Sequence, residues 1–209
     1  MTFERRFIRD LVHEEHRTDG SDVEKIVRGL KECYSAPDRH YHRGAHIIDC
    51  LETFNAVHVG MAASREIRAA IYFHDAILDP RRDDNEEKSA DYAKHQLLLL
   101  GYLPSFCERV ADIILGTKHT GGLVDRDQQI MADVDLSSLA ASWSTFSENT
   151  HDIREEYHWV SDDDFRKGRA DFLKNMLKRE YLYYTRSCRH LFELRARDNM
   201  TRSIQELLA

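Results

Sequence analysis

Apolar residues recur every three or four positions along most of the chain, the spacing that places them on one face of an α-helix. The stretch after Ser21 is typical, with apolar side chains at Val23, Ile26, Val27, Leu30 and Tyr34. No stretch of useful length alternates between apolar and polar residues, as a half-buried strand would. Only three prolines and nine glycines are present, so few residues interrupt a helix. The pattern predicts an all-α fold.

Capping residues and helix breakers divide the first half of this pattern. Ser21-Asp22-Val23-Glu24 has the form of a capping box, and Ala36-Pro37-Asp38 stops the helix that it starts. His42 and His46 are four positions apart, so they share one face if the next helix begins early enough. Ser64 is the expected N-cap of a helix over about 65–78.

The remaining helices follow from the same signals. Asp84, with Glu87 three residues later, caps a helix that ends at Gly101. Pro104 opens another, and the glycines at 121 and 122 end it. Three helices with polar faces are predicted near 145–158, 162–178 and 185–208. Residues 1–20, with charged side chains from His13 to His16, form an N-terminal arm or a short helix, and residues 21–209 form one helical domain.

The net charge of the protein limits the kinds of partner that it is expected to bind. Thirty basic and 37 acidic residues give a formal net charge of −7, which argues against a general nucleic-acid surface or an anionic membrane surface. A small phosphorylated substrate is still compatible, because a local basic pocket can exist on an acidic protein. No segment resembles a signal peptide or could span a bilayer, and the four scattered cysteines form no CxxC pair. We therefore expect a cytoplasmic protein with reduced thiols, and homo-oligomers are left open.

One apolar run contains side chains that a buried helix face normally avoids. His74, Asp75 and Asp79 lie within and directly after the run from Ala70 to Leu78. An uncompensated buried charge is unfavourable, so these groups need hydrogen-bond partners or a cation. The pair His151-Asp152 has the same two residues in a polar context and carries no such requirement. A metal site and a core histidine held by its neighbour both fit His74-Asp75 taken alone.

Similar residues occur elsewhere in a fixed order. His46 precedes His74 by 28 positions, and Asp135 follows Asp75 by 60. This order, His…His-Asp…Asp, resembles the HD-domain superfamily, in particular its small predicted metal-dependent phosphohydrolases. The resemblance runs from about Tyr34 to Asn199. The motifs that carry it are Tyr41-His42 with His46, Phe73-His74-Asp75, Asp84-Asn85-Glu86-Glu87-Lys88-Ser89, Thr117-Lys118-His119 and Asp133-Val134-Asp135-Leu136, with weaker ones at Ile153-Arg154-Glu155-Glu156-Tyr157 and Gly168-Arg169.

The resemblance implies a set of metal ligands, with Asp133 as a rival for the last place: His46, His74, Asp75 and Asp135. Mn, Fe, Co, Ni or Zn would suit imidazole and carboxylate ligands. Several members of the family place a glutamate where this chain has Leu78. The catalytic proton carrier is then expected among Asp79, Glu86 and Glu87, with Asp79 favoured. Expected substrate contacts are His42, Lys118, His119, Arg154, Tyr157 and Arg169.

Three functions are compatible with these residues. The first is a metal-dependent phosphohydrolase that acts on a small phosphorylated metabolite, such as a nucleotide, through metal-activated water. The second is a di-iron oxygenase on the same fold, which needs two further histidines between Asp75 and Asp135; His95 and His119 are the candidates. The third is a non-catalytic nucleotide-binding module. The single-metal hydrolase is favoured because His95 has no acidic or histidine neighbour.

Overall fold

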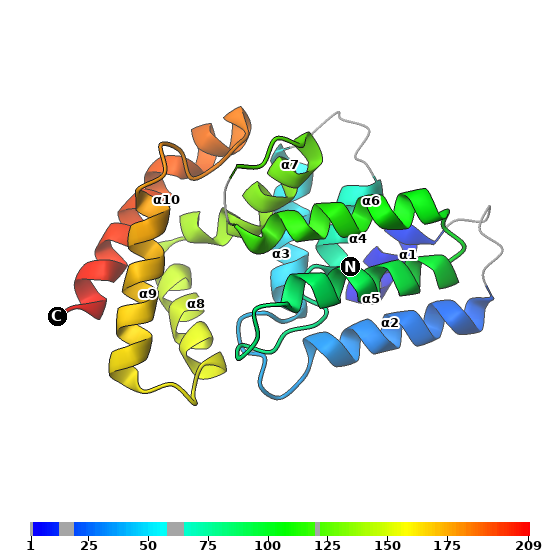
Figure 1. Ribbon diagram of the computed structural model, residues 1–209, viewed down its shortest axis with the longest axis horizontal. Helices are drawn as coiled ribbons and strands as arrows, with labels where there is room; N and C mark the ends of the chain where they lie inside the picture. Colours follow the sequence, from blue (N-terminus) through cyan, green and yellow to red (C-terminus); the bar gives the residue numbers. More distant parts are fainter. Residues whose placement is uncertain (1, 13–18, 58–64, 120–121) are drawn as a thin grey trace. The chain divides into compact units, whose positions relative to one another are not determined.

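A computed structural model of the protein describes residues 2–12, 19–57, 65–119 and 122–209 (Figure 1). These residues form ten α-helices and two short 3₁₀-helices, with no strand among them, so the predicted all-α fold is confirmed. Within the described part, no helix combines the length and apolar character needed to cross a membrane. The helices are α1 (Phe3–Leu11), α2 (Gly20–Tyr34), α3 (Gly44–Val57), α4 (Arg65–Phe73), α5 (Asn85–Leu99), α6 (Pro104–Leu115), η1 (Gly116–Lys118), α7 (Arg126–Asp135), η2 (Leu136–Ala140), α8 (Trp143–Glu156), α9 (Asp162–Leu177) and α10 (Arg186–Leu207).

The chain divides into two compact units, residues 1–132 and residues 133–209. The first comprises α1 to α6, η1 and most of α7, and the second comprises the last three residues of α7 with η2 and α8 to α10. The sequence predicts one helical domain over 21–209, and this stays a prediction. Periodicity does not reveal this division, because an apolar helix face looks the same whichever neighbour covers it.

Helix α4 is the centre of the first unit. It packs against α1, α3, α5 and α6, and its residues from Ala69 to Phe73 are fully buried. A helix that is apolar on every side is stable only inside a core. The N-terminal segment contributes to this core as a helix: Phe7 and Leu11 of α1 are fully buried, and the Phe7 ring meets the Tyr72 ring edge-on at 5.1 Å. The side chains at 13–16 lie outside the described residues.

Several helix ends differ from the sequence prediction. Asp19 caps α2 in place of Ser21, whose backbone N–H it accepts at 3.1 Å. Asp84 precedes α5 as predicted, but its carboxylate pairs with Arg82 and makes no capping hydrogen bond. Helix α4 ends at Phe73, five residues before the predicted end, so His74 and Asp75 lie in the turn that follows it. Ser64 and Gly121, the predicted cap and stop, lie outside the described residues.

The second unit has its own core and reproduces the predicted helices closely. Helices α8, α9 and α10 begin and end within two residues of the predicted 145–158, 162–178 and 185–208. Their N-caps are Ser142, Ser161 and Thr185, each of which accepts a backbone N–H with its side chain. Helix α10 packs against α9 and η2, and this unit buries Phe146, Leu173, Met176, Tyr183 and Met200.

Candidate metal centre

His74 is held in one orientation at the end of the buried helix α4. Its side chain is 1% exposed, and its Nδ1 lies 3.0 Å from the backbone carbonyl of Ile71. A carbonyl oxygen only accepts, so Nδ1 must carry the proton and donate. In the neutral ring this leaves Nε2 with its lone pair directed away from the helix.

Asp75 follows directly and presents one carboxylate oxygen to two imidazoles of the first unit. Its Oδ2 lies 3.0 Å from Nε2 of His74 and 3.8 Å from Nε2 of His46. The Asp75 side chain is 19% exposed, so one side of this arrangement remains open to solvent. The three side chains therefore converge at one point.

His46 reaches this point from α3. It is the third residue of the helix and is 5% exposed. Its ring lies 5.4 Å from the His74 ring, at an interplanar angle of 62°. Cys50, one helical turn later, brings its thiol sulfur to 3.7 Å from Nε2 of His46. His42 precedes α3, so it does not share a helix face with His46 as the spacing suggested, yet its ring lies 6.0 Å from the His46 ring.

The contact between His74 and Asp75 requires a proton or a cation between the two atoms. With Nδ1 donating to Ile71, a neutral His74 turns a lone pair toward the carboxylate oxygen at 3.0 Å. Two acceptors at this distance repel each other, and either a second proton on the ring or a cation reverses the sign of the interaction. A backbone carbonyl that accepts from the outer ring nitrogen is the usual arrangement behind a metal-bound histidine.

The distances also suit one ion. Donor atoms about 2.1 Å from a common ion lie roughly 3.0–4.2 Å apart, depending on the coordination geometry. The two distances from Asp75 Oδ2, 3.0 and 3.8 Å, fall in this range, and one ligand atom from each of His46, His74 and Asp75 lies within 4.8 Å of the others. Two imidazoles and a carboxylate are ligands that a divalent transition metal accepts. The residues therefore fit a metal.

Arg39 supports this arrangement and was missed by sequence reasoning. Its Nη1 donates to the backbone carbonyl of Asp75 at 2.5 Å and to that of His42 at 3.1 Å, and its Nη2 donates to the carbonyl of Ala76 at 2.9 Å. The guanidinium lies 5.2 Å from the centre of the Tyr34 ring. It thus ties the turn after α4 to the segment before α3. A single arginine in a loop carries no local signal for this role.

The loop between α4 and α5 is also fixed in place. Ser89 bonds both the N–H and the carbonyl of Ile77, each at 3.1 Å. Asn85 accepts from the N–H of Asp79 and donates to its carbonyl, both at 2.9 Å. The Asp79 carboxylate in turn accepts the backbone N–H of Arg81 at 3.0 Å through Oδ1. One oxygen of the favoured proton carrier is therefore used in a local turn.

The other two predicted acids and the Thr117-Lys118-His119 segment also belong to the first unit. Glu86 is half-buried, whereas Glu87 is exposed and forms an ion pair with Lys118. The hydrogen bond between them lowers the pKa of Glu87 and raises the pKa of Lys118. His119 ends η1 in the left-handed region, at φ 53°. Lys118 is thus engaged with a protein carboxylate.

Three of the predicted substrate contacts lie in the second unit: Arg154, Tyr157 and Arg169. Arg154 donates to the Tyr157 and Val160 carbonyls at 2.7 and 2.9 Å and pairs with Asp162 at 2.7 Å, so it closes the end of α8. Arg169 lies over the Phe172 ring at 5.3 Å, and Tyr157 stacks on Trp159 at 6.2 Å. The hydrogen bonds of Arg154 therefore lie within its own unit.

The two candidates for the last metal ligand, Asp133 and Asp135, have different surroundings within the second unit. Asp133 is fully buried, and its two oxygens accept the backbone N–H groups of Tyr184 at 2.6 Å and Thr185 at 2.7 Å. Burial nevertheless raises the pKa of Asp133, against the lowering effect of these bonds. Asp135 is half-buried and is the last residue of α7. The Asp133 carboxylate is therefore occupied by the start of α10.

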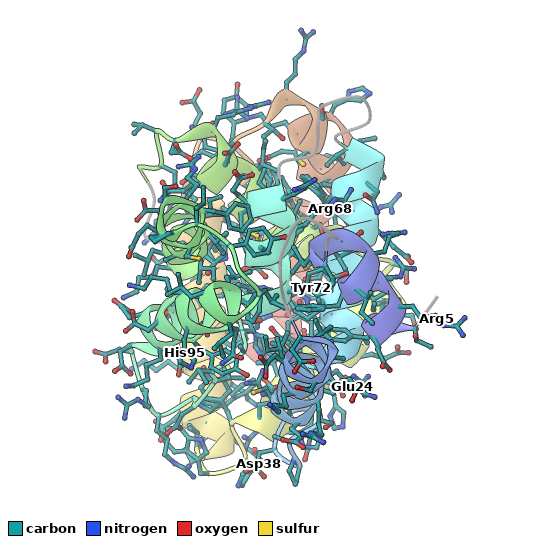
Figure 2. The ribbon with its side chains drawn as sticks, turned by 90° about the vertical axis from the view of Figure 1, so that its right-hand side faces the viewer. Arg5, Glu24, Asp38, Arg68, Tyr72 and His95 are labelled. Atoms are coloured by element: carbon teal, nitrogen blue, oxygen red, sulfur yellow. The ribbon has the colours of Figure 1, made fainter. Side chains whose placement is uncertain are left out.

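The two histidines considered for a second metal do not support one. His95 is exposed on α5 (Figure 2). Within the described residues, neither His95 nor His119 belongs to a group of three or more histidine, cysteine or acidic side chains close enough to share an ion.

Comparison of the chain with protein-family models, with curated proteins and with solved structures found no match.

Proposed function

We propose that the protein is a metal-dependent phosphohydrolase of the HD-domain type, active on a small phosphorylated metabolite, with a nucleotide as the first candidate. The observation that carries the proposal is the convergence of His46 and His74 on one carboxylate oxygen of Asp75. The site needs a proton or a cation, retains an open side, and is held by α3 and by the turn after α4. Such a site suits an ion that also takes a water and a phosphate oxygen.

Asp135 is the proposed fourth ligand. The alternative, Asp133, uses both oxygens to accept backbone N–H groups at the start of α10. Asp135 follows Asp133 by two residues on the same helix, and its side chain is half-buried. With two imidazoles and two carboxylates, Mn, Fe, Co, Ni and Zn are the candidate metals. Such an ion would lower the pKa of a bound water and polarise the phosphoryl group.

The chain's own residues then have defined tasks. The Ile71 carbonyl fixes the tautomer of His74, and Arg39 holds the backbone of Asp75 and Ala76. Asp79 is the proposed acceptor for a proton of the attacking water, because Asn85 fixes its backbone and its second oxygen is not used in the turn with Arg81.

The phosphate contacts are proposed on charge and position. Lys118 and His119 are the leading pair, and Lys118 would exchange Glu87 for the substrate phosphate. His42, whose ring lies 6.0 Å from that of His46, is a third donor. Arg154 is the least supported, because its donors already serve the end of α8. Tyr157 and Arg169 remain predictions.

The proposed compartment is the cytoplasm. All four cysteines lie in the described part of the chain, and none forms a disulfide. Thiols are the normal state of cysteine in a reducing compartment, where phosphorylated metabolites are also found.

The test begins with metal content. Purified protein is analysed for bound metals, and phosphate release from a panel of nucleotides and sugar phosphates is then measured with Mn, Co, Ni, Zn or Mg. Asp75→Ala should abolish metal binding and phosphate release together. His151→Ala, at an exposed histidine that also precedes an aspartate, is the matched control and should retain both.

Other outcomes would reject hydrolysis. Nucleotide binding that depends on Asp75, with no phosphate release under any metal, would indicate a binding module. Dioxygen uptake by the iron-loaded protein with two irons per chain would indicate the oxygenase. A metal-free protein that gains no metal at micromolar concentrations would remove the basis of the proposal.

A further inference from the structure

A second polar cleft lies in the first unit and shares no residue with the candidate metal centre. It has a volume of about 480 Å³ and is lined by Arg9, Asp10, Asn55, Arg65 and Arg68. These residues come from α1, α3 and α4. Figure 2 shows Arg68 close to Tyr72, on the side of α4 that faces α1 and α3. Three arginines in one cleft on an acidic protein require an explanation.

Among the described lining residues the one carboxylate is that of Asp10, and each of its oxygens already accepts a hydrogen bond. Asp10 is 8% exposed, and its Oδ1 accepts from Nε of Arg9 at 2.8 Å. Its Oδ2 accepts the hydroxyl of Tyr72 at 2.9 Å. Burial raises the pKa of Tyr72 well above its usual range, so the hydroxyl keeps its proton and remains a donor. Among the lining residues that the structure describes, three arginines accompany this one carboxylate.

Arg68 has a donor that the protein does not satisfy. Its side chain is 18% exposed, and Nη2 donates to Asn55 Oδ1 at 2.7 Å. Nη1 is buried and makes no hydrogen bond to any residue that the structure describes; the nearest carboxylate oxygen, Oδ2 of Asp10, is 3.8 Å away. A buried donor without an acceptor is destabilising, particularly on a charged group. The Phe54 ring, 5.1 Å from the guanidinium, fixes its plane.

We propose that this cleft binds a phosphate-type oxyanion, either free inorganic phosphate or the phosphate group of a small metabolite. The planar fork of arginine matches the oxygens of phosphate, and a cleft with three arginines favours an anion over a neutral ligand. The buried Arg68 Nη1 donor, which bonds no residue in the described part of the chain, is available to an oxygen of the anion. The small size of the cleft and the net negative charge of the protein fit a small molecule and not a nucleic-acid strand.

Binding is tested on metal-free Asp75→Ala protein, so that anion bound at the proposed metal centre does not contribute. Isothermal titration is carried out with inorganic phosphate, pyrophosphate and a nucleoside monophosphate. Arg9→Gln combined with Arg65→Gln alters the outer part of the cleft, where Arg9 is half exposed, and Arg68→Lys keeps the charge but removes the fork. Arg5→Gln is the control, at an exposed arginine one turn before Arg9 that points into solvent (Figure 2).

Saturable binding of at least one of these anions is expected, weakened about tenfold or more by the double variant and by Arg68→Lys, and unchanged by Arg5→Gln. Tighter binding of the nucleoside monophosphate than of inorganic phosphate identifies a metabolite as the ligand, and the reverse order identifies free phosphate. The proposal is overturned if no anion binds at millimolar concentration, or if the double variant, shown to be folded by circular dichroism, binds as tightly as the parent.

Discussion

The Arg39 guanidinium and the Asp75 backbone carbonyl are joined by a hydrogen bond of 2.5 Å between residues 36 positions apart. The same guanidinium also binds the carbonyls of His42 and Ala76. It therefore connects the segment before α3, which leads to His46, with the turn after α4, which carries His74 and Asp75. Together with the packing of α3 against α4, this side chain fixes the relative position of the proposed ligands in the first unit.

Replacing Arg39 should loosen the metal site. Arg39→Met removes three charge-assisted hydrogen bonds to carbonyls, and we expect metal affinity to fall by about 10–100-fold, as for other residues that orient ligands. Arg39→Lys should restore part of the loss, because an ammonium reaches one carbonyl but cannot span two. Metal dissociation constants from competition with a chelator are the measurement.

The control is Arg28→Met, at an exposed arginine of α2. It should leave metal affinity unchanged. If Arg39→Met lowers thermal stability while metal affinity stays that of the wild type, Arg39 stabilises the fold without positioning the ligands.

Asp79→Asn separates the proton-transfer role of Asp79 from its role in the turn. The asparagine side-chain oxygen can still accept the N–H of Arg81, so the loop is kept while the base is lost. We expect phosphate release to fall by about 10²–10⁴-fold with unchanged metal content. Assays across pH with the best substrate of the panel give the measurement. Activity close to that of the wild type would show that Asp79 stabilises the turn and is not the proton acceptor. Glu86→Gln would then be the next variant.

Asp133→Asn and Asp135→Asn should have opposite effects. An amide at 133 offers one acceptor where the carboxylate serves two backbone N–H groups, so one of them loses its partner. We expect the free energy of unfolding to fall by about 1–3 kcal/mol with metal content retained. Asp135→Asn should lose metal and keep most of its stability. Denaturation curves and metal analysis of both variants decide the assignment, and loss of metal from Asp133→Asn alone would reverse it.

Tyr92 makes the first unit sensitive to alkali. Burial raises its pKa to about 12, with the neighbouring Cys33 as a smaller cause. Between pH 10 and 12 the unfolded chain releases a proton that the folded chain keeps, so the free energy of unfolding falls as the pH rises, by at most about 1.4 kcal/mol per pH unit from this group. Below pH 10 this contribution is constant.

Tyr92→Phe removes the titrating group, so the variant should lose stability less steeply than the wild type above pH 10. Urea unfolding followed by circular dichroism at several pH values from 8 to 11.5 gives both slopes. The other buried tyrosines are common to the two proteins and cancel in the comparison. Parallel slopes would show that the Tyr92 proton is not coupled to folding.

The secondary structure of the second unit illustrates what local signals can predict. Helices α9 and α10 begin one residue after Ser161 and Thr185, and these caps act through backbone groups three residues away. Such contacts depend on neighbours in the sequence, so the predicted boundaries agree with the structure. The end of α4 was predicted less well, because the turn at His74 is held by Arg39 and Ser89 from distant segments.

The sequence by itself determined that this chain is helical and that His46, His74 and Asp75 are out of place among apolar residues. Periodicity and burial cost are local properties, and they can be read without coordinates. The tertiary structure decided that these three side chains meet at one oxygen, that Arg39 supports them, and that Arg154 and Asp133 serve their own unit. Those outcomes depend on distances between residues far apart in the chain, and a charged side chain gives no sign in the sequence of which partner it will reach.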